Sequence, residues 1–269
     1  MILFPGCKIN LGLSILNKRN DGYHNIDSVF LPIPLFDSLE FIESETFSFD
    51  CNLEIDQEKS NSIIKAYELL SKDFELPPIS IYLYKQIPMG AGLGGGSSNG
   101  AFMLRGLNDH FSLGLSVKKL EKYALEIGSD CPFFVDNEPK LVHGVGELLQ
   151  PISVDLSEFY IQLINPGIHV STKDAFENLN LKSIPIPTLF EVLNSSPVTD
   201  WKNLIFNDFE LPIFERYPEI KEIKDTLYQH KAIFALMTGT GSTVFGLFEK
   251  KPRDIDWPED YFVRTIKLS

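Results

Sequence analysis

The chain has 269 residues, of which 43% are hydrophobic and 23% are charged, and these proportions are typical of a globular protein large enough for one large domain or two modest ones. Its 24 lysines and arginines against 37 aspartates and glutamates give a formal net charge of −13. Nucleic acids and anionic membranes bind basic surfaces, so we expect neither as a partner. No apolar run approaches the length of about 20 residues that crosses a membrane, and the first residues do not resemble a signal peptide.

The three cysteines, Cys7, Cys51 and Cys131, are widely spaced and form no CxxC pair. An odd number at such spacing is typical of a reducing compartment and favours neither a disulfide framework nor a zinc site. We therefore expect a cytoplasmic protein. We interpret Cys7 and Cys131 first as small buried hydrophobic side chains.

Alternating residues predict a strand at 7–16, in which Lys8 and Asn10 share one face and lie within reach of one ligand. An ordinary solvated strand face would show the same alternation. Periodicity and turn residues predict, in chain order, a turn at 20–22, strands at 26–36 and 39–49, a helix at 59–73, a strand at 79–87, and helices at 97–108 and 117–127.

The second half is predicted to alternate as well. We expect a hairpin at 141–152, a strand at 160–164, a helix that begins near Ser171 and Thr172, irregular chain at 180–200, a helix at 218–229, and strands at 232–236 and 244–248 that flank a second glycine loop. Strands that alternate with helices throughout indicate an α/β or α+β architecture in two lobes.

The most informative segment is the glycine loop at 88–101, which contains six glycines and joins the strand at 79–87 to the helix that begins at residue 97. Such a loop brings bare backbone N–H groups close to an anion, and we expect Ser97 and Ser98 to cap the helix. A flexible linker would also be rich in glycine, but linkers rarely lie between a strand and a helix. The segment therefore predicts a phosphate-binding loop.

Two common phosphate motifs do not account for this loop. The Walker pattern needs a Gly-Lys-Ser/Thr ending, and no lysine follows Gly96. A dinucleotide fingerprint matches Gly90, Gly92 and Gly95 in spacing, but Asp109 comes directly after the helix instead of after a second strand.

Asp130 lies two residues before Pro132, between the end of a helix and an apolar stretch. Its side chain could cap a short helical turn. It could equally be an acid–base group, because aromatic surroundings tune the pKa of a carboxyl group. The residues leave both interpretations open.

Three separated segments together resemble the motifs of the GHMP kinases: Cys-Lys-Ile-Asn-Leu at 7–11, Pro-x-x-x-Gly-Leu-Gly-Gly-Gly-Ser-Ser at 88–98, and Met-Thr-Gly-Thr-Gly-Ser-Thr at 237–243. The resemblance covers nearly the whole chain in the right order. It implies an α+β fold with an N-terminal ATP-binding lobe that contains a left-handed β-α-β unit, a C-terminal α/β lobe, and an active site in the cleft. We place the domains at 1–153 and 154–269.

Further segments resemble one branch of this family, whose members phosphorylate the 2-hydroxyl of a methylerythritol linked to cytidine diphosphate, on the non-mevalonate route to isoprenoid precursors. They are Asp-Gly-Tyr-His at 21–24, Gly-Ser-Asp-Cys-Pro at 128–132, Gly-Val-Gly-Glu at 144–147 and Asn-Pro-Gly at 165–167. Two alternatives remain: another small-molecule kinase of the homoserine or mevalonate type, and a catalytically silent nucleotide-binding module.

The resemblance implies ATP and Mg²⁺ as cofactors, with Asp130 as general base and Lys8 beside it. The ATP-binding residues would be Pro88, Met89, Gly90, Ala91, Gly92, Leu93, Gly94, Gly95, Gly96, Ser97 and Ser98. The substrate-binding residues would be Asn10, Tyr23, His24, Thr172, Phe176, Gly239 and Gly241, with the cytosine held between Tyr23 and Phe176. Thr172 could instead cap a helix, and Phe176 could belong to a helix core. The sequence assigns neither metal ligands nor an oligomeric state.

Overall fold

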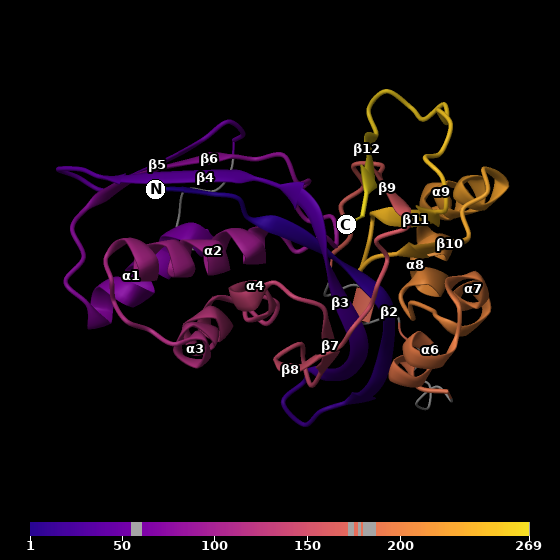
Figure 1. Cartoon of the computed structure of the whole chain (residues 1–269), viewed down its shortest axis with the longest axis horizontal. Helices are drawn as coiled ribbons and strands as arrows, with labels where there is room; N and C mark the ends of the chain where they lie inside the picture. Colours follow the sequence, from indigo (N-terminus) through magenta and orange to yellow (C-terminus); the bar gives the residue numbers. More distant parts are fainter. Residues whose placement is uncertain (55–60, 172–174, 177–178, 180–186, 269) are drawn as a thin grey trace. The chain divides into compact units, whose positions relative to one another are not determined.

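The structure, a computed structural model, describes residues 1–54, 61–171, 175–176, 179 and 187–268 (Figure 1). It divides into two compact units. Unit 1 comprises 1–8, 34–89 and 94–138, and unit 2 comprises 9–33, 90–93 and 139–269. Neither unit is a continuous segment, and the domain boundary at 153/154 stays a prediction. In the described part of the chain, no helix is both long enough and apolar enough to span a membrane.

Unit 1 is built on a sheet with the strand order β1 (Ile2–Leu3), β4 (Ser38–Glu43), β6 (Ile79–Tyr84), β5 (Ser48–Cys51). β4 is antiparallel to β6, whereas β5 is parallel to it and is connected to it through α1 (Ser62–Asp73), so that β5, α1 and β6 form a β-α-β unit. Figure 1 shows α1 and α2 (Gly95–His110) along one face of this sheet.

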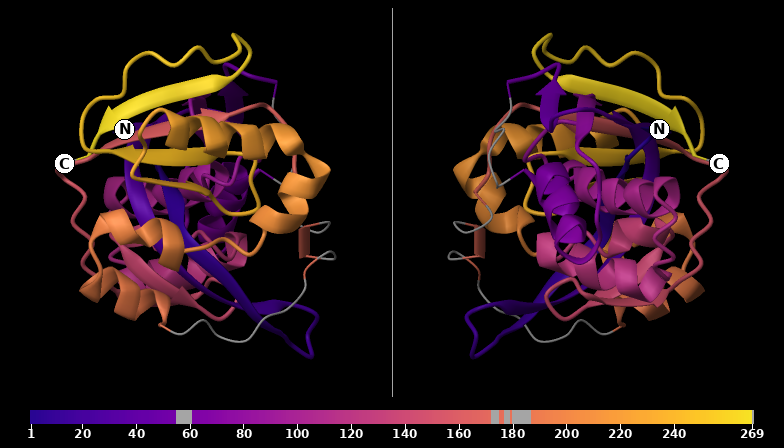
Figure 2. Two further views of the ribbon diagram at one scale, coloured as in Figure 1. Left: turned by 90° about the vertical axis from the view of Figure 1, so that its right-hand side faces the viewer. Right: turned by 90° about the vertical axis from the view of Figure 1, so that its left-hand side faces the viewer.

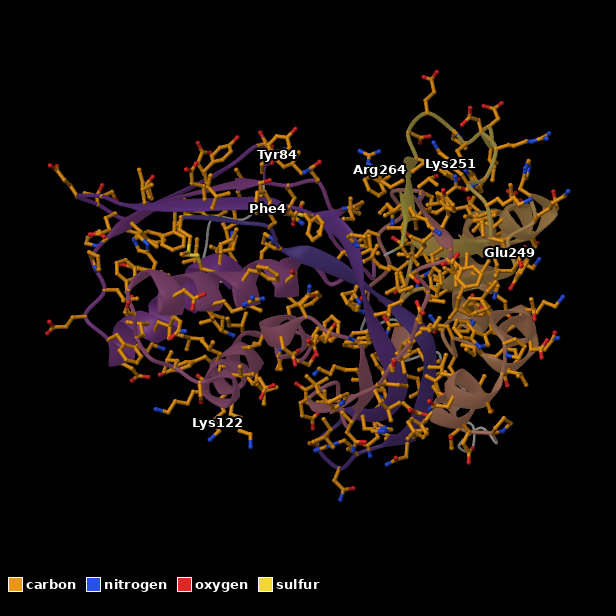
Figure 3. All side chains as sticks on the ribbon, viewed as in Figure 1. Phe4, Tyr84, Lys122, Glu249, Lys251 and Arg264 are labelled. Carbon is orange, nitrogen blue, oxygen red and sulfur yellow. The ribbon has the colours of Figure 1, made fainter. Side chains whose placement is uncertain are left out.

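Alternation along β6 explains why the helices cover only that face. Ile79, Ile81 and Leu83 are buried, while Tyr82 and Tyr84 are exposed, because successive side chains of a strand point to opposite faces. Figure 3 shows Tyr84 on the outer face of the sheet. α3 (Val117–Ile127) and the short α4 (Phe133–Asp136) complete unit 1.

Unit 2 contains most of a sheet ordered β2 (Gly6–Lys18), β3 (His24–Phe36), β7 (Lys140–His143), β8 (Leu148–Pro151). Its second sheet is antiparallel, ordered β10 (Phe234–Met237), β11 (Val244–Phe248), β9 (Tyr160–Asn165), β12 (Phe262–Lys267). α9 (Pro218–Gln229) packs on β10 and β11 through its buried face of Ile220, Ile223 and Leu227, and Figure 2 shows it beside this sheet. The remaining helical segments are α6 (Leu189–Ser195), the 3₁₀ turn Val198–Asp200, α7 (Trp201–Leu204) and α8 (Glu210–Arg216).

Most predicted elements are confirmed, and the helices at 117–127 and 218–229 have the predicted bounds. The single strand at 39–49 is wrong: it is two strands, β4 and β5, because β4 pairs antiparallel with β6 and β5 pairs parallel with it, so the chain must reverse at 44–47. The irregular stretch at 180–200 is wrong in its last part. There α6 begins with a capping box, in which Thr188 and Glu191 bond each other's backbone N–H.

Candidate active site

The glycine loop leads from β6 into α2, as predicted, but the helix starts earlier than the serines suggested. Its N-cap residue is Gly94, which has a φ of 69° and makes no side-chain capping bond. The prediction that Ser97 and Ser98 cap the helix is therefore wrong, because both lie within its first turn. The first intrahelical bond runs from the Ser98 N–H to the Gly94 carbonyl at 2.9 Å, so the amides that precede Ser98 in the helix have no partner within it. Such a helix N-terminus suits an anion.

Two glycines at this helix start are required by their surroundings. A Cβ atom on Gly94 would lie 2.9 Å from the Phe134 ring and 3.2 Å from Cε of Lys8. A Cβ atom on Gly95 would lie 2.9 Å from Ile87 and 3.0 Å from Nζ of Lys85. The loop backbone at Gly94 therefore packs closely against the side chain of Lys8, the predicted catalytic lysine.

Lys8 and Asp130 form an ion pair, with Nζ and Oδ2 3.6 Å apart. The Lys8 side chain is 4% exposed and that of Asp130 is 32% exposed, so solvent reaches the carboxylate but not the ammonium. Burial lowers the pKa of Lys8, and the charge of Asp130 opposes that shift. α4 has Pro132 at its N-cap and no side-chain capping bond, so the interpretation of Asp130 as a cap is wrong. The pair offers a partly exposed proton acceptor beside a buried cation.

The interpretation of Cys7 and Cys131 as small buried hydrophobic side chains is confirmed. Both side chains are buried and neither forms a disulfide, and burial raises the pKa of each thiol to about 12. A thiol with that pKa stays protonated near neutral pH and is a poor nucleophile. Cys51 forms no disulfide either. The cytoplasmic location stays a prediction.

In unit 2, segments of all three motifs meet at Thr238, which is fully buried. Its Oγ1 accepts a hydrogen bond from the Asn10 backbone N–H at 2.8 Å. The single proton of the same hydroxyl can reach the Gly92 carbonyl at 3.2 Å or the Asn10 side-chain oxygen at 3.3 Å. The side-chain amide of Asn10 in turn donates to Ser28 Oγ at 2.9 Å. Asn10, a predicted substrate residue, is therefore held in one orientation.

The glycine loop at 237–243 packs directly on Gly92 of the loop at 88–101. A Cβ atom on Gly92, where φ is 77°, would lie 2.1 Å from the Thr238 carbonyl oxygen, and one on Gly239 would lie 3.2 Å from Cα of Gly92. Gly239 and Gly241 both have positive φ, at 59° and 88°. Only glycine permits this close approach with these backbone angles.

Two residues that the sequence analysis missed hold the glycine loop at 237–243. Asn207 donates from its side chain to the carbonyls of Met237 (2.7 Å) and Gly239 (2.8 Å). The buried carboxylate of Glu210 accepts from the Met237 N–H at 2.9 Å and pairs with Lys224 at 2.6 Å. Both residues lie in a stretch that gave no prediction, where α7 and α8 are too short to show a clear periodicity.

The predicted cytosine-binding residues are partly brought together. His24 stacks on Phe176, with ring centroids 5.0 Å apart and an interplanar angle of 17°. Phe176 also packs edge-on against Phe209 of the hydrophobic core, at 4.9 Å. Tyr23 is 65% exposed at the predicted turn, and Thr172 lies outside the described residues.

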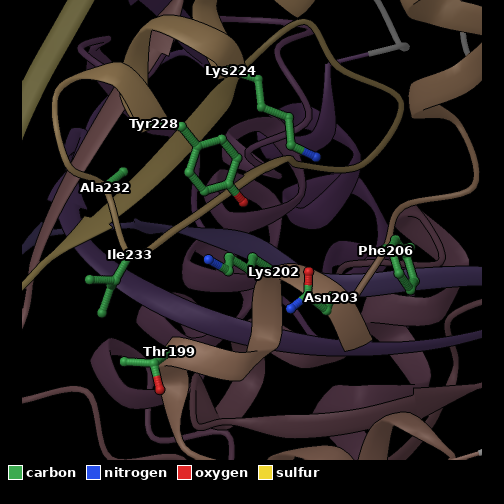
Figure 4. A pocket seen from close by; sticks show the side chains of 8 residues that line it. All are labelled: Thr199, Lys202, Asn203, Phe206, Lys224, Tyr228, Ala232 and Ile233. Carbon is green, nitrogen blue, oxygen red and sulfur yellow. The ribbon is translucent and has the colours of Figure 1, made fainter.

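Two cavities in unit 2 contain none of the predicted site residues. In the larger one, of about 650 Å³, Lys224 and Tyr228 of α9 face Lys202 and Asn203 of α7 (Figure 4). The other, of about 440 Å³, is lined by residues such as Val170 and Arg216. Among the residues that the structure describes, no group of three or more His, Cys, Asp or Glu side chains could hold a metal ion.

Comparison with known proteins agrees with this geometry. The family model for the GHMP kinases N terminal domain matches residues 61–137, and the model for GHMP kinases C terminal matches 189–255. The 4-diphosphocytidyl-2-C-methyl-D-erythritol kinase of Bacteroides fragilis is 46% identical over 98% of this chain and 99% of its own length. The enzyme of the same name from Bacteroides thetaiotaomicron is 47% identical over 97% of this chain and 98% of its own.

Solved structures place the fold in the same group. A crystal structure of 4-(cytidine 5'-diphospho)-2C-methyl-D-erythritol kinase superimposes with a TM-score of 0.77 and 29% identity, over 92% of this chain and 90% of that one. The Methanococcus jannaschii mevalonate kinase superimposes with a TM-score of 0.67 at 14% identity, over 100% of this chain and 98% of that one, which shows the shared fold alone.

The fold and these matches define a small-molecule kinase that uses ATP, and the predicted two-lobed α+β kinase fold is confirmed. Within the GHMP kinases, the chain belongs to the 4-diphosphocytidyl-2-C-methyl-D-erythritol kinase family.

Proposed function

We propose that this chain transfers the γ-phosphoryl group of ATP to the 2-hydroxyl of 4-diphosphocytidyl-2-C-methyl-D-erythritol, a step of the non-mevalonate route to isoprenoid precursors. The observation that carries the proposal is the full-length similarity to relatives of that name at 46% and 47% identity. The Asp-Gly-Tyr-His turn at 21–24, which the resemblance associates with cytosine binding, supports the same substrate.

The glycine loop would hold the phosphates of ATP. Its residues from Pro88 to Ser98 lead into the N-terminus of α2, where backbone N–H groups and the helix dipole favour negative charge. This way of binding needs no cluster of lysines, which agrees with the acidic net charge of the chain.

Ser98 fits a role with Mg²⁺ or a phosphate oxygen. Its hydroxyl is fully buried and has no hydrogen-bond partner in the described structure. A hydroxyl oxygen at the start of a phosphate-binding helix is the kind of ligand that Mg²⁺ takes in P-loop NTPases. The bound ion would neutralise charge on the transferred phosphoryl group.

Asp130 would accept the proton of the substrate hydroxyl, because its partly exposed carboxylate is the proton acceptor of the ion pair. Lys8 would keep that carboxylate charged and stabilise charge that develops on the phosphoryl group. A tertiary hydroxyl is hindered, so positioning matters as much as proton transfer. Asn10, held by Thr238 and Ser28, would orient the diol.

Tyr23, His24, Phe176 and Thr172 would bind the cytidine part of the substrate, and Gly239 and Gly241 would contribute the backbone of the glycine loop at 237–243. The stack of His24 on Phe176 supplies a flat aromatic surface that suits a base. Replacing Tyr23 by alanine should raise the KM for the cytidine substrate and leave the KM for ATP unchanged. An unchanged KM for both would count against the cytidine assignment.

The decisive experiment measures ADP release in a coupled assay with four acceptors: the diphosphocytidyl substrate, its methylerythritol phosphate fragment, homoserine and mevalonate. We expect turnover with the first alone. Turnover with homoserine or mevalonate would favour another GHMP kinase. No turnover with any acceptor, together with retained ATP binding, would favour a silent nucleotide-binding module.

A further inference from the structure

Asp37 lies between β3 and β4 and belongs to none of the three motifs, yet its fully buried carboxylate makes four contacts. Oδ1 accepts hydrogen bonds from the backbone N–H groups of Gln86 at 2.8 Å and Ile87 at 2.9 Å. Oδ2 accepts from the side-chain amide of Asn99 at 2.9 Å and pairs with the Lys85 ammonium at 2.5 Å. We call these five residues the Asp37 cluster.

The cluster ties together both ends of the glycine loop. Gln86 and Ile87 come directly before Pro88, the first of the predicted ATP-binding residues, and Asn99 comes directly after Ser98, the last of them. One carboxylate therefore joins the chain just after β6 to the second turn of α2. Backbone N–H groups bind an anion well only when their positions are set beforehand, because ordering them at the moment of binding costs free energy.

Lys85 explains why a charged group is needed at this position. Its ammonium is buried and lies 3.0 Å from the site that a Cβ atom on Gly95 would occupy, at the first residue of α2. A cation is unfavourable at a helix N-terminus, and a buried cation without a partner is strongly destabilising. Asp37 neutralises this cation at the point where the helix begins.

We infer that Asp37 is a positioning residue for nucleotide binding: it holds the glycine loop and the start of α2 in the geometry that receives the phosphates of ATP, without touching the nucleotide. The inference rests on the proposed role of the loop. It assigns a function to a carboxylate that lies about 50 residues upstream of the loop in the sequence.

Three variants test the contacts of the Asp37 carboxylate one by one. In Asp37→Asn, the amide oxygen can still accept from Gln86 and Ile87, but its NH₂ group faces two donors, Lys85 and Asn99. The double variant Asp37→Asn/Lys85→Met removes one of these conflicts, so it should melt at a higher temperature than Asp37→Asn alone. Asn99→Ala keeps the ion pair and cuts only the link to α2.

The readout is the Kd for ATP, measured by calorimetry on the whole protein without acceptor, together with the Kd for the diphosphocytidyl substrate alone. We expect the double variant to bind ATP at least tenfold more weakly and Asn99→Ala at least fivefold more weakly, with substrate affinity within twofold of wild type. If Asp37→Asn does not fold, these two variants carry the test. ATP affinities within twofold of wild type in both would overturn the inference.

Leu70→Ala is the matched control, because Leu70 is a fully buried residue of α1 and takes no part in the hydrogen bonds of Asp37. It should lower the melting temperature and leave the Kd for ATP unchanged. If all variants lost ATP affinity in proportion to their melting temperatures, Asp37 would be merely structural and the inference would be wrong. If the wild type bound ATP but not the cytidine substrate, the proposed acceptor would be wrong, and the result for Asp37 would stand.

Discussion

Replacing Thr238 by valine removes one hydroxyl and leaves the shape of the side chain nearly unchanged. The Asn10 backbone N–H then loses its acceptor at 2.8 Å, and the Gly92 carbonyl loses a donor at 3.2 Å. Thr238 is fully buried, so water does not replace these bonds freely. A buried polar group without a partner costs roughly 1–3 kcal/mol.

Movement of Asn10 and Gly92 to recover these bonds would misplace a predicted substrate-binding residue and the predicted ATP-binding loop together. If the transition state loses the same roughly 1–3 kcal/mol, kcat/KM should fall about 5- to 150-fold, because each 1.4 kcal/mol corresponds to about a factor of ten. Thr238→Ser keeps the hydroxyl and loses only a methyl group, so kcat/KM should stay within about threefold of wild type. The stability cost of that lost methyl should be about 1 kcal/mol.

Coupled ADP release and thermal melting of the wild type, Thr238→Ser and Thr238→Val provide the comparison. A valine variant with wild-type kcat/KM would refute the argument. A serine variant as impaired as the valine variant would also refute it, because the hydroxyl would then not be the cause.

Asp130→Asn should lower kcat by about 10²–10⁴-fold and leave the Kd for ATP nearly unchanged, as seen by single-turnover kinetics and calorimetry; near-normal turnover would exclude the general-base role. Because burial lowers the pKa of Lys8 below the ordinary 10.5, kcat/KM should decline at a pH below 10.5 as the ammonium loses its proton, and Lys8→Arg, if active, should lack that decline. The same shift means that the unfolded chain binds more protons between the two pKa values, so the contribution of Lys8 to stability grows as pH rises through that window. A wild-type kcat/KM that stays constant up to pH 10.5 would contradict the lowered pKa of Lys8. Iodoacetamide at pH 8 should label Cys51 in the folded protein and the other two cysteines only after denaturation, as read by mass spectrometry. Labelling of either buried thiol in the folded state would show that its environment opens.

The sequence was most informative where a feature depends on the residue type itself or on its near neighbours in the chain. Glycine in the left-handed region, as at Gly92 and Gly94, leaves a signature that needs no knowledge of the fold. Periodicity similarly predicted α3 and α9 to the residue. These features depend on neighbours in the chain and can therefore be read from it.

Contacts between distant segments could not be predicted in the same way. Asp37 meets Gln86 and Asn99 only because β4 pairs with β6, and Glu210 meets Met237 only because α8 packs on α9, which in turn packs on β10 and β11. Nothing in the local sequence around a single aspartate or glutamate outside a motif indicates that its side chain holds a distant loop in place. The start of α2 was misplaced because two serines imitate a cap, whereas the left-handed backbone of Gly94 begins the helix.

The division of the chain into interleaved units has a practical consequence. The chain passes from one unit to the other at 8/9, 33/34, 89/90, 93/94 and 138/139, and three of these passages lie in or beside the first two motifs. A nested pattern of this kind leaves no single cut that keeps both units intact. Even a cut at 138/139, which leaves unit 1 whole, separates 9–33 and 90–93 from the rest of unit 2. Fragments that contain only part of unit 2 should therefore be recovered with that unit unfolded, and a split version should work only if both pieces are produced together and reassemble.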